Sequence, residues 1–106
     1  MSRGLLAHNV YFTLKNGTAA NRTKLLQSIG KHLTGHPGTL FFASGILEDS
    51  LQRPVNDRNF DVAVHVVFEN LAAFGRYMAS ERRQQWVNEH QESWKQVRVF
   101  DSILQR

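Results

Sequence analysis

The sequence predicts an α+β domain whose elements follow the order β-α-β-β-α-β, and three observations support this prediction. The chain has 106 residues, which is the length of one domain and too short for two independent cores. Hydrophobic residues make up 42% of it and charged residues 21%, the balance of a globular protein. Segments that alternate apolar and polar residues are interleaved with segments of helical periodicity. We therefore expect a single domain over residues 1–106, with its core at about residues 7–102.

The first half of this order can be justified element by element. Residues 7–14 predict a strand, because apolar side chains alternate there with polar ones. Thr18 has the side chain of a helix N-cap, and apolar residues recur at helical spacing from there to about Leu33. The Gly-His-Pro-Gly stretch at 35–38 ends that helix. A second strand is expected at about residues 39–47.

A polar stretch at residues 48–59 follows the second strand, and it is long for so small a domain. Loops of this length are often functional or mobile. Residues 61–68 then make the strongest strand, which is apolar on both faces apart from His65. Asn70 is the expected N-cap of the next helix.

The chain from residue 80 to its end contains one more helical segment and one more strand. Ser80 is the expected N-cap of the segment, in which Trp86, His90 and Trp94 recur at i, i+4 and i+8. This apolar stripe more often belongs to a core than to a stacking surface. Residues 97–102 alternate again and predict a short last strand.

The complete order is the ferredoxin-like pattern, in which helices cover only one face of the sheet. The other face would carry Tyr11, Val67, Phe100 and part of residues 41–47. A face this apolar is rarely left in water. We expect a second copy of the chain to cover it, so that the protein is a homodimer through the open sheet face.

Residues spread over nearly the whole chain have an order and spacing typical of one family. They are His8 at the first strand, Pro37 and then Gly45, the alternating Val64, Val66 and Phe68, Tyr77, Trp86, and the terminal set Trp94, Val97, Val99, Phe100 and Asp101. The chain thereby resembles the stress-responsive A/B barrel (Dabb) family of dimeric α+β barrels. The resemblance implies a small apolar ligand pocket between the sheet and the helices, around His8. Its expected lining is Val10, Phe12, Val64, Val66, Tyr77, Met78, Trp86 and Trp94.

Some members of this family resemble polyketide cyclases of the olivetolic acid cyclase type, which close a ring by aldol chemistry without a cofactor. The resemblance implies that Tyr77 stands at their catalytic tyrosine and Asp101 at the aspartate that orients their histidine. Arg83 stands where that histidine is expected. Guanidinium stays protonated at neutral pH, so Arg83 cannot act as a base but can hold an anion. We expect Arg83 to form a salt bridge with Asp101.

His8 is the other candidate for acid–base chemistry. In a ferredoxin-like sheet the first strand lies beside the last and antiparallel to it, so His8 begins close to where Asp101 ends. A carboxylate beside an imidazole orients the ring. Two interpretations stay open: His8 is a base or hydrogen-bond anchor for a ligand, or it is a buried histidine satisfied by Asp101 or by the backbone.

Three hypotheses for function follow. The first is a Dabb homodimer of uncharacterised activity, with a small hydrophobic or carbonyl-containing molecule in its pocket. The alternative is a cofactor-free enzyme, a cyclase-like aldol lyase or a small monooxygenase, which uses Tyr77 and His8 with Arg83 and Asp101. A third is an interaction module recognised through the 48–59 loop. No cofactor is expected in any of them.

Composition argues against several other classes. Thirteen Lys and Arg residues oppose nine Asp and Glu, but they are scattered rather than gathered into a patch for nucleic acid. The chain has no cysteine, so thiolate chemistry is excluded. His32 and His36 have the spacing of metal ligands on one helix, but Gly35 and Pro37 break that helix, so no metal site is expected. Neither a membrane span nor a signal peptide is apparent, so we expect a cytoplasmic protein.

Overall fold

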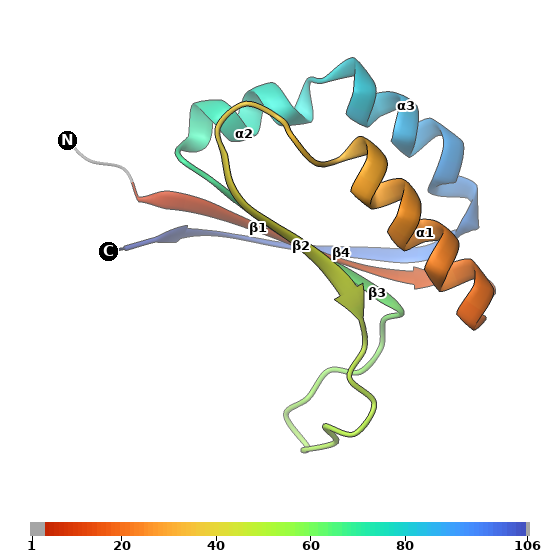
Figure 1. Ribbon diagram of the computed structural model, residues 1–106. Helices are drawn as coiled ribbons and strands as arrows, with labels where there is room; N and C mark the ends of the chain where they lie inside the picture. The colour runs from red at the N-terminus through yellow and green to blue at the C-terminus, as the bar shows by residue number, and fades with distance from the viewer. Residues whose placement is uncertain (1–3, 106) are drawn as a thin grey trace.

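Residues 4–105, which the computed structural model describes, form a four-stranded antiparallel sheet with helices on one face (Figure 1). In chain order the elements are β1 (Leu5–Leu14), α1 (Ala19–His32), β2 (Thr39–Ile46), β3 (Val62–Phe68), α2 (Leu71–Met78), α3 (Glu81–His90), a 3-10 turn (Gln91–Ser93) and β4 (Trp94–Leu104). The strand order across the sheet is β2-β3-β1-β4. The ferredoxin-like α+β prediction is therefore confirmed.

All three predicted N-cap residues cap the N-termini of their helices. The side-chain oxygens of Thr18, Asn70 and Ser80 each accept a hydrogen bond from the backbone N–H three residues on, at 3.2, 2.8 and 3.3 Å. Each bond satisfies an N–H that the first turn of a helix leaves without a partner. These local signals explain why the helices begin where the sequence predicts.

The last strand differs from the prediction in its length and in the position of Trp94. β4 begins at Trp94, not Val97, and pairs with β1 as far as Leu104. The helical stripe of Trp86, His90 and Trp94 is therefore wrong at its third member, because α3 ends at His90 and the 3-10 turn redirects the chain. Trp94 still packs on Trp86, with ring centroids 5.2 Å apart, but it does so from the sheet.

The core lies between the helices and one face of the sheet. Its largest fully buried side chains are Ile29, Val62, Val64, Val66 and Phe68. Alternate residues of β3 point to the helices, and the β1 residues that pair beside them do the same. The sheet face that meets the helices is thus the buried one.

The opposite face of the sheet is open and apolar, as expected. Phe41 and Phe100 are both 55% exposed there. Tyr11 lies between Phe60 and Phe100, with ring centroids 5.0 and 5.8 Å from its own. Tyr11, Phe60 and Phe100 border a hollow of about 620 Å³ at the end of the sheet from which the 47–61 loop leaves.

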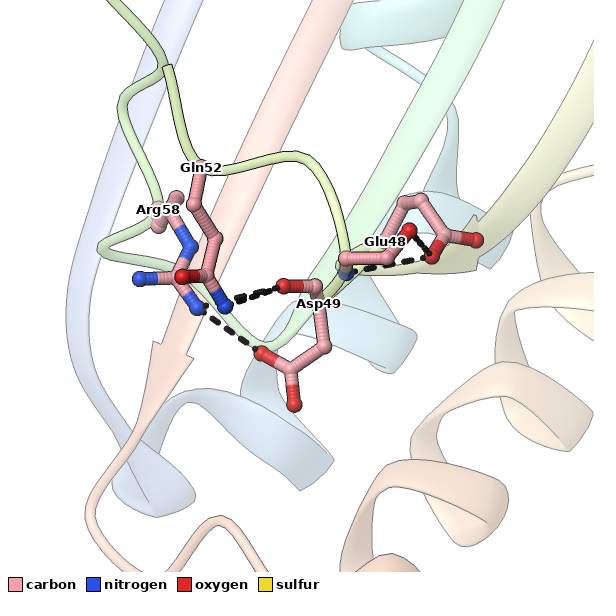
Figure 2. Close-up of polar contacts among 5 residues, drawn as sticks. Glu48, Asp49, Gln52 and Arg58 are labelled. Carbon is pink, nitrogen blue, oxygen red and sulfur yellow. Dashed lines mark hydrogen bonds and ion pairs between the residues drawn. The ribbon is translucent and has the colours of Figure 1, made fainter. Parts of the chain in front are cut away.

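The 47–61 loop projects from the sheet (Figure 1) and folds on itself through polar contacts (Figure 2). Glu48 accepts a hydrogen bond from the Ser50 hydroxyl at 2.6 Å. Asp49 pairs with Arg58 at 3.2 Å, and its carbonyl accepts from Gln52 at 2.9 Å. The second half of the loop is tied to the sheet, because Asp57 pairs with Arg98 of β4 and the Asn59 carbonyl accepts from the Thr13 hydroxyl at 2.9 Å.

No helix within residues 4–105 is long and apolar enough to cross a membrane.

Candidate functional site

A cavity of about 260 Å³, the sheet–helix cavity, lies where β1 and β4 face α2 and α3. Its walls include these residues that the sequence singled out: His8, Val10, Phe12, Val64, Tyr77, Met78, Arg83, Trp86, Trp94 and Asp101. Leu33, Phe74, Val87, Val97 and Val99 complete the lining. The cavity opens beside β4, because Val97 and Val99 are 39% and 48% exposed.

Val66 is the one expected lining residue that the structure places elsewhere. It lies in β3 between His8 of β1 and Phe42 of β2, and it is only 1% exposed. Val66 packs in the core and is not among the residues that line this cavity.

His8 and Asp101 meet across the β1–β4 pair. The antiparallel register places them directly opposite each other, which brings their side chains to the same face. Nδ1 of His8 lies 2.5 Å from Oδ1 of Asp101. The histidine side chain is 6% exposed and the carboxylate 42%. A buried imidazole is thus held in one orientation by a carboxylate that itself reaches solvent.

Tyr77 stands beside this pair on α2. It is 4% exposed, and its ring centroid lies 6.1 Å from that of His8. Burial raises the pKa of its phenol, against the opposing influence of the Arg83 cation. The phenol is therefore neutral at physiological pH and can donate a hydrogen bond.

Arg83 lies in the first turn of α3, and its expected salt bridge with Asp101 is wrong. Its guanidinium is 5.7 Å from the Tyr77 ring centroid and donates to the Met78 carbonyl at 3.4 Å. Asp101 is not among its partners, and the strand register instead places the Oδ1 atom of that carboxylate against His8. Among residues 4–105, no carboxylate lies within ion-pair distance of Arg83.

Two neighbours of the cluster, His36 and Phe74, were not predicted as site residues from the sequence. His36 is 8% exposed and meets the Tyr77 ring edge-on, with centroids 4.9 Å apart. Its Nε2 contacts the His32 carbonyl at 3.1 Å, so the two residues form a helix-end contact. Phe74, one helical turn before Tyr77, packs on His8 with centroids 5.0 Å apart. The i, i+3 spacing on α2 could have indicated Phe74, but His36 follows a turn and carries no periodic signal.

No group of three or more His, Asp or Glu side chains within residues 4–105 could hold a metal ion.

The geometry supports a defined set of chemical steps. Asp101 accepts from Nδ1 of His8, so the lone pair of the neutral ring lies on Nε2, where it can take up a proton. Tyr77 and Arg83 can donate hydrogen bonds to a negatively charged oxygen. Apolar side chains form most of the remaining wall. This end of the cavity thus combines a proton acceptor with two hydrogen-bond donors, and the rest of the wall is mostly apolar.

A family comparison covers nearly the whole chain. The model of the Stress Responsive A/B Barrel Domain (Dabb) family matches residues 6–104. Among curated proteins, none matches the sequence.

Similar solved structures cover the chain equally well. A Dabb family protein with a ferredoxin-like fold from Mesorhizobium loti is 21% identical, with a TM-score of 0.79 over 98% of this chain and 100% of that one. A dimeric ferredoxin-like protein of unknown function from Thermobifida fusca is 12% identical, with a TM-score of 0.76 over 98% and 94%. The hydroxynitrile lyase of Passiflora edulis is 18% identical, with a TM-score of 0.76 over 99% and 97%.

Proposed function

The chain belongs to the stress-responsive A/B barrel (Dabb) family, and on this premise we propose that it is a ligand-binding homodimer with one small molecule in each sheet–helix cavity. The observation that carries the proposal is the cavity itself. It joins apolar walls to a polar end made by His8, Asp101, Tyr77 and Arg83. Binding pockets have this composition, with a few polar groups that orient a largely apolar ligand.

Native mass spectrometry of the purified protein tests this binding function. We expect a co-purified small molecule that is lost from Val99→Trp, because the indole would fill the mouth of the cavity. Gln85→Trp is the matched control, since Gln85 is exposed on α3 and does not line the cavity. An adduct that survives in Val99→Trp would place the ligand elsewhere.

Self-association through the open sheet face is the second part of the proposal. Phe41, Phe100 and the 620 Å³ hollow beside Tyr11 make this face too apolar to remain in water. Several structures with this fold are described as dimeric, including those from Thermobifida fusca and Bacteroides fragilis. Pairing two such faces would bury the exposed rings of both copies.

Light scattering at micromolar concentration tests the association. We expect twice the 12.2 kDa mass of one chain for the wild type, and the single mass for Phe100→Asp. Leu71→Asp is the control, because Leu71 is 61% exposed but lies on α2, away from the open face. A wild-type protein of 12.2 kDa would refute the proposed dimer.

The His8–Asp101 contact favours a second candidate function, cofactor-independent proton transfer on a carbonyl compound. Nε2 of His8 would take the proton from the carbon beside the carbonyl, and the C–H electron pair would form an enolate. The enolate oxygen would accept hydrogen bonds from Tyr77 and Arg83. The enolate carbon could then take a proton back from His8. In an aldol reaction it would instead attack a second carbonyl, whose π electrons move to its oxygen, and that alkoxide would take the proton from His8.

Deuterium exchange tests this chemistry without knowledge of the natural substrate. In D₂O, the protein should accelerate the loss of the α-proton NMR signals of phenylacetone. Because a positioned base contributes roughly 10²–10⁴-fold, His8→Gln should remove most of the acceleration. Asp101→Asn should reduce it, while His32→Gln, on α1, should not. Exchange no faster than in buffer, or unaffected by His8→Gln, would exclude the enzyme hypothesis.

A further inference from the structure

Among the arginines of residues 4–105, Arg83 is distinguished by two properties together. It has no acidic partner, and it lines a mostly apolar cavity. Arg58 and Arg98 pair with Asp49 and Asp57, and Arg82 donates to the His32 and Thr34 carbonyls. Arg83 is half-buried, lines the sheet–helix cavity and has only the Met78 carbonyl and the Tyr77 ring beside it. A partly desolvated cation is costly unless an anion or several acceptors meet it.

One carboxylate, that of Asp101, lines the same cavity as Arg83. Oδ1 of Asp101 is bound by Nδ1 of His8 at 2.5 Å. The strand register sets that contact, and within residues 4–105 no hydrogen bond or ion pair joins Asp101 to Arg83. The guanidinium therefore keeps most of its five N–H donors for something that enters the cavity.

Tyr77 adds a donor at the same end. Its ring lies under the Arg83 guanidinium, and burial keeps its phenol protonated. A guanidinium has no acceptor atom, and a neutral phenol beside it can offer its O–H. Two adjacent donors of this kind match an oxyanion better than they match an amine or an alcohol.

The rest of the cavity limits the size and character of the ligand. Val10, Phe12, Val64, Trp86, Val97 and Val99 offer it only carbon surfaces and ring faces. A volume of about 260 Å³ equals roughly nine water volumes, enough for one ring or a short chain beside a head group. A long-chain lipid or a nucleotide would not fit inside it.

We propose that the ligand of the sheet–helix cavity is a small aromatic or aliphatic carboxylate, with its head group held by Arg83 and Tyr77 and its apolar part against Trp86 and Trp94. This inference rests on the proposed ligand-binding function and specifies its ligand class. It also gives Arg83 a role that the histidine expected at this position could not fill while unprotonated, because guanidinium carries its charge at every physiological pH.

Intrinsic fluorescence provides a direct readout, because the chain has two tryptophans and both line the cavity. Titration with phenylacetate and with its neutral isostere phenylacetamide should give saturable changes for both compounds. The carboxylate should bind roughly ten- to a hundred-fold more tightly, the range expected for hydrogen bonds to a charged group.

Variants separate the head-group contact from the cavity. Arg83→Gln should reduce phenylacetate affinity to that of phenylacetamide and leave the amide nearly unchanged. Arg83→Lys should restore part of the preference, since it keeps the charge but loses the planar fork of donors. Arg76→Gln is the control, because Arg76 is exposed on α2 and does not line the cavity. Circular dichroism melts of each variant would verify folding.

The possible outcomes test the carboxylate assignment separately from the proposed ligand-binding function. Equal affinity of the wild type for the two compounds would overturn the carboxylate assignment and leave the ligand-binding cavity standing. A preference for phenylacetate that persists in Arg83→Gln would overturn the role of Arg83. If neither compound changed the fluorescence up to millimolar concentration, both the assignment and the small-molecule cavity would be refuted.

Discussion

Replacing Gly38 by alanine should destabilise the fold by roughly 2–5 kcal/mol, and the structure separates the cost into two parts. Gly38 has φ +84°, in the left-handed region, where a residue with a Cβ loses about 1–2 kcal/mol. The new Cβ would also lie 2.4 Å from Cβ of Ala73. Ala73 is fully buried in α2, so backbone would have to move, and overpacking of this kind costs about 1–3 kcal/mol.

Gly35 provides the matched control. It has φ +75°, but a Cβ there would meet no atom within 4 Å. Gly35→Ala should therefore show the conformational cost alone. Urea unfolding at one fixed protein concentration gives the free energy of each variant, and the fixed concentration matters because association would add to the apparent stability.

A double-mutant cycle isolates the packing part. Ala73→Gly costs about 1 kcal/mol by itself, as glycine does in a helix, but it removes the atom that the new Cβ would strike. Combined with Gly38→Ala it should recover much of the overpacking cost, which gives a non-additive pair. Equal losses in Gly38→Ala and Gly35→Ala, or strict additivity in the cycle, would refute the contact between this turn and α2.

Three further predictions concern helix propensity, capping and pH. Gly30→Ala should raise the free energy of unfolding by about 1 kcal/mol, because Gly30 is exposed within α1 and has open space around it; a lower midpoint in a thermal melt would contradict this. Ser80→Ala should cost about 1 kcal/mol in urea unfolding through loss of the α3 cap, and Ser80→Asp should restore most of it. The raised pKa of Tyr77 means that its neutral form stabilises the fold below pH 10 and that this stability is lost as the pH rises through the folded pKa. Unfolding measured from pH 8 to 11 should therefore show a smaller decline in Tyr77→Phe than in the wild type, and identical slopes would exclude this assignment.

Features set by nearby residues were predictable from the sequence. The caps at Thr18, Asn70 and Ser80 depend on a side chain and an N–H three residues apart, so the helix starts were expected where they occur. The face to which a strand residue points alternates with a period of two. This period correctly placed His8 on the sheet face that meets the helices and Tyr11 on the open face. The length of β4 could not be predicted from alternation. Its alternating residues are 97–102, but pairing with β1 extends the strand beyond them at both ends.

Features set by partners distant in sequence were predictable only in part. The topology alone predicted that His8 would lie near Asp101, 93 residues away, because the first and last strands are neighbours. It could not say which hydrogen-bond donor would contact the Asp101 carboxylate, and the predicted salt bridge with Arg83 was the wrong choice. That choice depends on a register correct to one residue, since a slip of one would turn Asp101 to the open face.

The sequence by itself determined the order of the elements, the family and the sheet face that carries the polar candidates, because each of these depends on local periodicity and spacing. The tertiary structure alone decided how those candidates are connected. The β1–β4 register joins His8 to Asp101, and the packing of α2 against the sheet buries Tyr77 beside His36. The same arrangement leaves the charge of Arg83 facing an apolar cavity. A charged side chain interacts with the groups that folding brings within a few ångströms, because the interaction energy falls with distance. The spacing of residues along the sequence does not specify which groups these are.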